Sequence, residues 1–161
     1  AQVGRGYAPV GQTPELHHNS QRASINYVAS ISNQGMVRFM LYTQKLTAQV
    51  FITFLERLIA KRTRKLIWIV DRHPVHRSQL VRQWLVRHRK DIEIFYLPPY
   101  SPQLNPAEYL NCDVKQGVHS KPPTRNQNQL KQRVLSHLRK LQKLPRRIMK
   151  YFEHPFIAYA G

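Results

Sequence analysis

The sequence predicts an α/β fold in which a mixed sheet is flanked by helices, and three observations support that class. Residues 23–43 contain two stretches in which apolar and polar side chains alternate, as they do in half-buried strands. Two short apolar runs, 66–70 and 92–97, are separated by a stretch with helical periodicity, which predicts a parallel crossover. The length of 161 residues and the hydrophobic fraction of 42% suit one domain with one modest core.

The first half of the chain is expected to form a loop, a hairpin and a helix. Residues 4–20 are rich in Gly and Pro and poor in apolar side chains, so we expect a loop there. The alternating runs 23–32 and 36–43 predict a β-hairpin with Gly35 in its turn. Thr47 is expected to cap the next helix, because the apolar residues after it recur at helical spacing.

The second half begins with the elements of the crossover. The run Leu66–Val70 is wholly apolar and is followed by Asp71, which is typical of a strand buried on both faces. A helix over 80–89 and a strand over 92–97 complete the crossover. The prolines of 98–102 exclude a helix, so we expect the chain to turn there.

Two further helices are expected beyond this turn. Asn105 and Pro106 predict a helix start, with Asn105 as the N-cap and Pro106 as the first helical residue. Pro122 and Pro123 mark the next break in the chain. The last helix is basic and amphipathic, and its apolar face consists of Leu130, Val134, Leu138 and Leu141.

The charge of the chain predicts a polyanionic partner. The sequence has 26 Lys and Arg against 8 Asp and Glu, a net charge of +18, and most of the excess lies beyond residue 60. Nucleic acid is the expected partner ahead of an acidic membrane surface, because the apolar residues follow core periodicities and no run is long enough to span a bilayer. The single cysteine excludes an internal disulfide and a Cys-based zinc site, and it fits a reducing compartment.

Two of the eight carboxylates are candidates for chemistry. Asp71 follows a buried strand, and open α/β sheets place their sites at the carboxyl ends of strands. We therefore expect a metal ligand there, although an Asx turn ahead of Pro74 would also explain the residue. Glu108 falls at the third position of its helix, where it is either a ligand or the acidic member of a capping box.

Two other reactive groups receive less weight. His73 and His76 would complete an Asp-x-His-x-x-His zinc pattern with Asp71, but histidines are scattered through the chain and no His-Glu-x-x-His helix is present. Cys112 is expected to be a small core residue rather than a nucleophile.

Two segments resemble the DDE transposases of the mariner-related insertion sequence six-thirty family. They are LIWIVDRHPVH at 66–76 and YLPPYSPQLNPAEYLNCDVK at 96–115. The second segment is the more specific, because it combines a Leu-Pro-Pro turn, Tyr-Ser-Pro, Leu-Asn-Pro and a Glu on the next helix. A weaker likeness extends to GRGYAPVGQTP at 4–14 and to the helix over 51–58.

The resemblance implies a ribonuclease-H-like, integrase-type core whose three carboxylates hold two Mg²⁺ or Mn²⁺ ions. Such a site cuts DNA at transposon ends and joins the freed 3′ hydroxyl to target DNA. Asp71 matches the second carboxylate and Glu108 the third. Residues 1–120 would be part of this catalytic domain, and 121–161 a basic helical extension packed on it.

The chain also departs from the family pattern. The first carboxylate of the family lies on a strand upstream of the GRGYAPVGQTP segment, so the resemblance places that central strand and its Asp outside this chain. We therefore expect open strand edges, marginal stability, weak metal binding and little or no turnover. Arg72 stands where Asn or Gly is more usual, and Asn111 replaces a frequent Trp.

The resemblance further implies DNA partners, both transposon ends and target DNA, and no membrane partner. The expected DNA contacts are Arg72, His76, Arg77, Lys115 and Lys121, and Lys115 shares a helix face with Glu108. A homodimer or larger assembly in the full-length protein, and a prokaryotic cytoplasmic, nucleoid-associated location, are expected by analogy. The alternative is a non-catalytic basic nucleic-acid-binding protein or a decayed transposase remnant.

Overall fold

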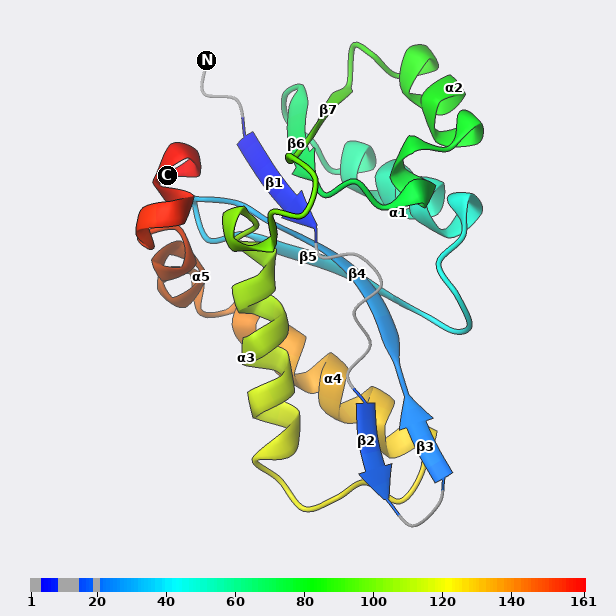
Figure 1. Cartoon of the computed structure of the whole chain (residues 1–161), viewed down its shortest axis with the longest axis vertical. Coiled ribbons are helices and arrows are strands. Elements are labelled where there is room, and N and C mark those ends of the chain that lie inside the picture. The colour runs from blue at the N-terminus through cyan, green and yellow to red at the C-terminus, as the bar shows by residue number, and fades with distance from the viewer. Residues whose placement is uncertain (1–3, 9–14, 19–20) are drawn as a thin grey trace.

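A five-stranded mixed sheet forms the centre of the computed structural model, which describes residues 4–8, 15–18 and 21–161 (Figure 1). The strand order is β5-β4-β1-β6-β7, with β4 antiparallel to β1 and β5, and with β6 parallel to β1 and β7. The strands are β1 (Gly4–Ala8), β4 (Asn26–Ile31), β5 (Val37–Tyr42), β6 (Leu66–Val70) and β7 (Ile92–Tyr96). A separate antiparallel pair consists of β2 (Glu15–His18) and β3 (Gln21–Ser24).

The segment GRGYA, as β1, fills the central place of the sheet, where we expected a gap, and it carries no carboxylate. β1 pairs in parallel with all of β6, from Gly4 opposite Leu66 to Ala8 opposite Val70. The ladder uses backbone N–H and C=O groups, which glycine supplies like any other residue, so a Gly-rich sequence can still fill this position. β6 has a neighbour along its whole length on both sides, so the expectation of an open edge does not apply to it. Among the described residues β4 pairs with β1 only at Ile31, opposite Tyr7.

Helices cover both faces of the sheet (Figure 1). On one face α1 (Ala48–Ala60) and α2 (Gln79–Arg87) enclose a core centred on Phe51, Phe54 and Trp68. On the other face three helices pack against Tyr27 and its neighbours on β4. These are α3 (Ala107–His119), α4 (Gln127–Gln142) and α5 (Pro145–Tyr151). The chain ends in a 3₁₀ turn, η3 (Pro155–Ala160), and two others, η1 (Pro74–Arg77) and η2 (Pro102–Leu104), lie in connecting segments.

Most elements form where the periodicity predicts them. The hairpin β4–β5 has Gly35 in its turn with φ of 90°, a backbone conformation that favours glycine. Thr47 caps α1, because its hydroxyl oxygen accepts a hydrogen bond from the N–H of Val50. The strand–helix–strand unit β6–α2–β7 is parallel as expected, and the four leucine and valine positions of α4 are buried.

The prediction of a loop over residues 4–20 was wrong for the two segments that form strands. β1 and β2 lie in this stretch, whose other residues are outside the described part of the chain. Neither strand has a run of alternating β-branched and aromatic residues, so no periodic signal reveals them. No helix in the described part of the chain is long and apolar enough to cross a bilayer.

Candidate metal site formed by two carboxylates

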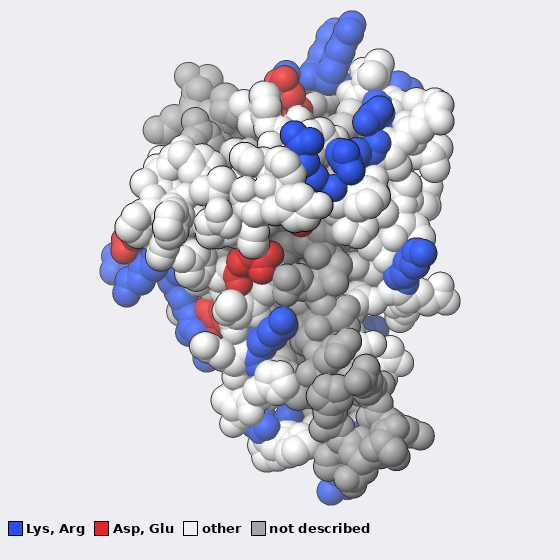
Figure 2. Space-filling view, in the orientation of Figure 1, with Lys and Arg blue, Asp and Glu red and all other residues white. Residues whose placement is uncertain are grey.

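Asp71 and Glu108 line one cavity at the carboxyl edge of the sheet. Asp71 directly follows β6, and Glu108 lies in the first turn of α3. The cavity has a volume of about 190 Å³ and is closed on the opposite side by the Pro-rich turn 98–102. Figure 2 shows acidic side chains near the N-terminal end of α3, with Lys and Arg side chains spaced around them. The fold thus brings together the two carboxylates that the sequence singled out.

Asp71 is held in its ionised form by local hydrogen bonds. Its Oδ1 accepts from the backbone N–H of His73 at 3.0 Å, and the Nδ1 of His76 lies 3.3 Å from the same oxygen. Burial alone would raise the pKa of this carboxyl, but the bonds from His76 and His73 outweigh burial and lower it. The Asx turn therefore exists, and it leaves 37% of the side chain exposed to the cavity and solvent.

Glu108 shows the opposite shift. Burial raises the pKa of its carboxyl, the negative charge of Asp71 raises it further, and Asn111 and Lys115 only partly offset these effects. The two carboxylates are therefore close enough to repel each other. A divalent cation between them would relieve that repulsion, and carboxylate oxygens are the ligands that Mg²⁺ and Mn²⁺ prefer.

The backbone at the start of α3 is held by bonds of Asn105. The side-chain oxygen of Asn105 accepts from the N–H of Ala107 at 3.1 Å. The helix itself begins at Ala107 with Pro106 as its N-cap, one residue later than predicted. In a capping box the acidic side chain would accept from the N–H of Asn105, but this group donates to the carbonyl of Pro102 at 3.0 Å. Glu108 lines the cavity shared with Asp71.

Two residues behind Glu108 were not among the predicted site residues. Tyr27 of β4 is 1% exposed and donates a hydrogen bond from its hydroxyl to Oδ1 of Asn111. Burial, followed by the negative charge of Glu108, raises the pKa of Tyr27, so the hydroxyl stays protonated. Asn111 is buried, and it lies near enough to lower the pKa of Glu108, although its Nδ2 has no acceptor at full hydrogen-bond geometry among the described residues. Only the departure of Asn111 from the family pattern marked this position in the sequence.

The other predicted contacts divide into exposed and buried groups. Arg72, Arg77, Lys115 and Lys121 have exposed side chains, and the Nε of Arg72 donates to the carbonyl of Leu97 at 3.1 Å. The charge of Lys115 acts on Glu108, as the shared helix face predicts.

His76, which we expected to contact DNA, is not accessible to a ligand in this structure. Its side chain is fully buried and stacks on Phe51 with ring centroids 4.4 Å apart, so it supports Asp71 from behind. No group of three His, Cys, Asp or Glu side chains assembles in the described part of the chain, and His73 and His76 do not form one with Asp71. Cys112 is exposed and is not the core residue that we expected.

The rim of the cavity carries a strained aromatic residue. Tyr100 has a φ of 53°, in the left-handed region that non-glycine residues seldom occupy, and its side chain is fully exposed. The turn thus presents a free aromatic ring beside the two carboxylates.

Comparisons with known proteins agree on the fold. The catalytic domain of Mos1 mariner transposase superposes with a TM-score of 0.61 at 18% identity, covering 98% of this chain and 82% of that chain. A structure of the same domain with raltegravir and Mn gives a TM-score of 0.64 at 15% identity, with the same coverage. The catalytic core domain of BIV integrase gives 0.57 at 17% identity, covering 93% of this chain and 95% of that chain. The ribonuclease-H-like fold class is thereby confirmed.

The family is shown by a sequence model rather than by these distant likenesses. No curated protein sequence matches the chain significantly. A family model described as DDE superfamily endonuclease matches residues 1–131, which is most of the chain. The protein therefore belongs to the DDE superfamily of endonucleases, with a transposase and integrase type of catalytic-domain fold.

Proposed function

We propose that this chain provides two metal-binding carboxylates of a transposase that cleaves DNA strands and transfers them at transposon ends. The observation that carries the proposal is the shared cavity, in which Asp71 raises the pKa of Glu108. Membership of the DDE endonuclease superfamily and the fold shared with a mariner transposase support the same function.

The site offers some, but not all, of the carboxylate ligands that a divalent cation would need. Its two carboxylates offer oxygen ligands and repel each other until a cation neutralises them. The central strand β1, with the sequence GRGYA, contains no Asp or Glu and so adds no third carboxylate. We propose Mg²⁺ or Mn²⁺ as the cofactor, and a structure of the Mos1 domain was solved with Mn. Held by Asp71 and Glu108, such ions would supply positive charge that stabilises the attacking and leaving oxygens of a phosphoryl displacement.

The chain's own residues position these ligands and hold the DNA. His73 and His76 keep Asp71 ionised and oriented, while Asn111 supports Glu108 from the core side. Arg72 and Lys115 supply positive charge beside the cavity for the phosphodiester backbone. The exposed ring of Tyr100 is placed to stack on a base next to the bound phosphate.

A direct test is Mn²⁺ binding by the full 161-residue chain, followed by the enhancement of water proton relaxation. Asp71→Asn and Glu108→Gln should each weaken binding by about tenfold or more, because ligand charge sets divalent-cation affinity. Glu56→Gln is the matched control, because Glu56 is an exposed carboxylate on α1 outside this cavity. Equal binding by all four proteins would contradict the proposed site.

A second test separates catalysis from binding. Supercoiled plasmid is incubated with the chain and Mg²⁺ or Mn²⁺, and nicked product is followed by gel electrophoresis. We expect slow nicking or none, since β1 adds no carboxylate to the pair. Any metal-dependent nicking that survives Asp71→Asn would remove Asp71 from the site.

The proposed partners are DNA at transposon ends and at the target, in a dimer or larger synaptic assembly of the full-length protein, within the prokaryotic cytoplasm. The net charge of +18 also favours a second candidate, a basic protein that binds nucleic acid without cutting it. That candidate predicts an affinity for duplex DNA that is the same with EDTA and with Mg²⁺. It also predicts no change of this affinity in Asp71→Ala and Glu108→Gln.

A further inference from the structure

A groove runs along the side of α4 that faces away from the core. Its volume is about 540 Å³, and Gln132, Ser136, Arg139 and Lys143 line it at helical spacing. The buried leucine and valine side chains of α4 form the opposite side of the helix. The groove shares no lining residue with the cavity of the two carboxylates. Its described lining residues all come after residue 131, where the match to the endonuclease family model ends.

Three positive charges lie in the groove without a negative partner. The side chains of Arg139, Lys140 and Lys143 are exposed, and no ion pair joins them to a carboxylate among the described residues. α4 contains no Asp or Glu, and Asp113 on the neighbouring α3 is already bound by Arg147. The groove therefore attracts anions without competition from these carboxylates.

The sequence around the groove carries charge of one sign over a long stretch. Between Asp113 and Glu153 the chain has eleven Lys and Arg residues and no Asp or Glu. Exposed helices gain stability when opposite charges lie four residues apart, and like charges at that spacing destabilise them. Arg139 and Lys143 are such a like-charged pair, and the negative end of the helix dipole offsets only part of their repulsion. A bound polyanion would neutralise both.

The length of the charged stripe suits a phosphate backbone better than a single small anion. Gln132 and Lys143 are eleven residues apart, which is about 16 Å along a helix. Duplex DNA carries one negative charge per roughly 1.7 Å of its axis, so several phosphates would lie beside this stripe. Gln132 and Ser136 add neutral groups of a kind that often contacts phosphate oxygens. An acidic membrane fits less well, because Leu135 and Leu144 are the only apolar side chains among the described residues of the groove.

We infer that the groove on α4 binds the phosphate backbone of a DNA duplex, at a site separate from the cavity of Asp71 and Glu108. Arg139, Lys140 and Lys143 hold phosphates, and the side chains of the neutral residues donate hydrogen bonds to the same backbone. Contacts of this kind carry no sequence preference. The choice of DNA as the polyanion rests on the proposed function, whereas binding in the groove requires neither a metal nor the two carboxylates.

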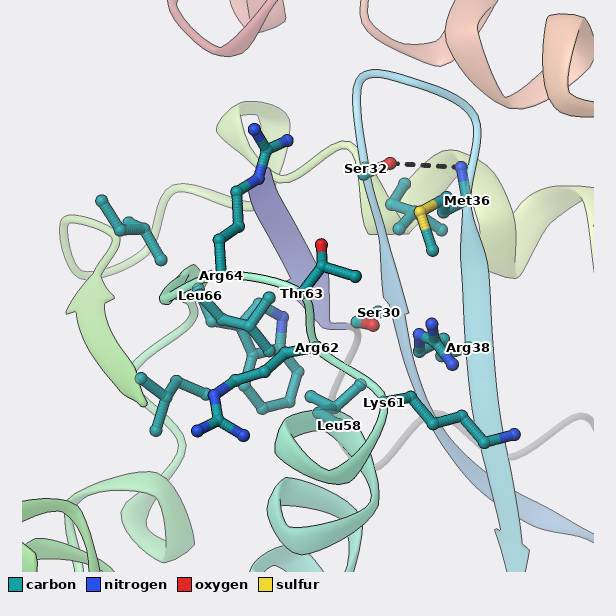
Figure 3. A pocket seen from close by; sticks show the side chains of 14 residues that line it. Ser30, Ser32, Met36, Arg38, Leu58, Lys61, Arg62, Thr63, Arg64 and Leu66 are labelled. Carbon is teal, nitrogen blue, oxygen red and sulfur yellow. Dashed lines mark hydrogen bonds between the residues drawn. The ribbon is translucent and has the colours of Figure 1, made fainter. Parts of the chain in front are cut away.

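The test measures the affinity of the full 161-residue chain for a fluorescein-labelled 20-base-pair duplex by anisotropy in EDTA. The groove variant carries three substitutions, Arg139→Gln, Lys140→Gln and Lys143→Gln. The control variant carries three substitutions of exposed cations outside the groove, Arg57→Gln, Lys61→Gln and Arg89→Gln. Figure 3 shows Lys61 at the end of α1. Both variants lose three positive charges, so a difference between them cannot come from total charge.

The groove variant should bind the duplex about tenfold or more weakly at 100 mM salt. The slope of log affinity against log salt concentration should fall by about 2.7, because each lost phosphate contact removes about 0.9. The control variant should change the slope by less than about one. Equal effects in the two variants would overturn the inference. Glutamine has a helix propensity close to that of lysine and arginine, and urea denaturation verifies that both variants are folded.

A photo-crosslink tests which ligand occupies the groove. Cys112→Ser removes the single cysteine, and Ser136→Cys then carries an azidophenacyl group, with Gln83→Cys on α2 as the control. The label at Ser136 should crosslink to the duplex several-fold more than the label at Gln83. The inference is overturned by equal crosslinking at both positions. It is also overturned if the groove variant loses binding to phosphatidylglycerol vesicles but keeps its affinity for the duplex.

A further variant separates this inference from the proposed function. Asp71→Asn should weaken neither duplex binding in EDTA nor the crosslink at Ser136. Loss of duplex binding in Asp71→Asn would place the DNA at the carboxylate cavity and overturn the inference. A groove that binds DNA in a chain that fails to bind Mn²⁺ would support the inference and count against the proposed metal site alone.

Discussion

Asp71 and Glu108 share one cavity, but their pKa values shift in opposite directions because their surroundings differ. Asp71 receives hydrogen bonds from a backbone N–H and from His76, so its pKa is lowered despite burial. Glu108 is buried with only partial compensation, and the charge of Asp71 adds to the cost of ionising it. In the free protein the two carboxylates therefore repel each other, and a bound cation would offset this repulsion.

Glu108→Gln should stabilise the metal-free fold at pH 7. The pKa of Glu108 is higher in the folded protein than the ordinary value of 4.5. Its contribution to stability is therefore fully present below pH 4.5 and is lost as the pH rises through the folded pKa. At pH 7 the ionised side chain is therefore a net cost. Removal of its charge should increase the free energy of unfolding by roughly 0.5–2 kcal/mol. Urea denaturation at pH 7 measures this change, with Glu56→Gln as control, and a destabilised Glu108→Gln would contradict it.

A third carboxylate, which is buried, has a structural role that the sequence did not reveal. Asp113 of α3 is 7% exposed and accepts hydrogen bonds from Arg147 at 2.7 Å and from the hydroxyl of Tyr151. His137 of α4 contacts its other oxygen at 2.8 Å. Burial alone would raise the pKa of Asp113, but these bonds together hold it at about 2. One side chain thus joins α3, α4 and α5.

Asp113→Asn should destabilise the protein by about 2–4 kcal/mol at pH 7, because the substitution breaks a buried charged network. The contribution of Asp113 is complete above its unfolded pKa of 3.8 and is lost as pH falls toward its folded pKa of about 2. The difference between the two proteins should therefore shrink between about pH 4 and pH 2. Urea denaturation over this range tests it, and a difference independent of pH would assign the effect to packing instead.

At the scale of elements, the position of α3 depends on its close contact with α4. Gly117 faces His137, and a Cβ at this position would lie 2.2 Å from the imidazole ring. The ring itself is fixed by its bond to Asp113. The glycine thus permits the close approach of two helices, although it lowers the intrinsic stability of α3.

Gly117→Ala should destabilise the protein by about 1–3 kcal/mol through overpacking, despite the higher helix propensity of alanine. In a His137→Ala background the clash is absent, so the same substitution should become neutral or stabilising by up to about 1 kcal/mol. Thermal denaturation of the four proteins in this double-mutant cycle gives the coupling. A coupling near zero would show that the ring moves away without cost.

An element can be predicted from the sequence when its side chains follow a periodic apolar pattern. The hairpin, α1, β6, α2, β7 and α4 carry periodic apolar side chains, so pattern alone locates them. Asp71 and Glu108 were found because one follows a buried strand and both lie in specific motifs. β1 was missed because its pairing rests on backbone groups in a Gly-rich segment. The burial of His76 and the support from Tyr27 depend on tertiary packing, which spacing does not reveal.

At the scale of the whole molecule, charge dominates the expected behaviour. Seven of the eight acidic residues lie beyond residue 50, yet basic residues still greatly outnumber them and the net charge is +18. Only a few described cations are neutralised by ion pairs, such as Arg62 with Asp91 and Arg147 with Asp113. The remaining positive charge is available to phosphate groups on DNA.

DNA binding by the chain should therefore depend steeply on salt. If about six phosphates are contacted, affinity for a 20-base-pair duplex should fall by roughly a thousandfold between 50 and 200 mM salt. Fluorescence anisotropy without metal measures the slope, and Lys115→Gln should reduce it by about one unit without changing sequence preference. Asp71→Asn is a suitable control, because loss of a negative charge should not weaken electrostatic binding. A shallow salt dependence would exclude a phosphate-tracking surface.

The central place of β1 has a consequence for how the molecule folds. β1 is the sole link in the sheet between the β4–β5 hairpin and the parallel pair β6–β7, and Gly4 pairs with Leu66 far along the chain. The sheet can close only after β6 has formed. The chain must therefore lose the conformational entropy of closing a long loop before the hydrogen bonds between β1 and β6 can stabilise it. Until then the inner edges of β4 and β6 are open to strands of other chains. Yield on refolding should therefore depend strongly on protein concentration, because dilution favours the slow intramolecular closure over intermolecular pairing.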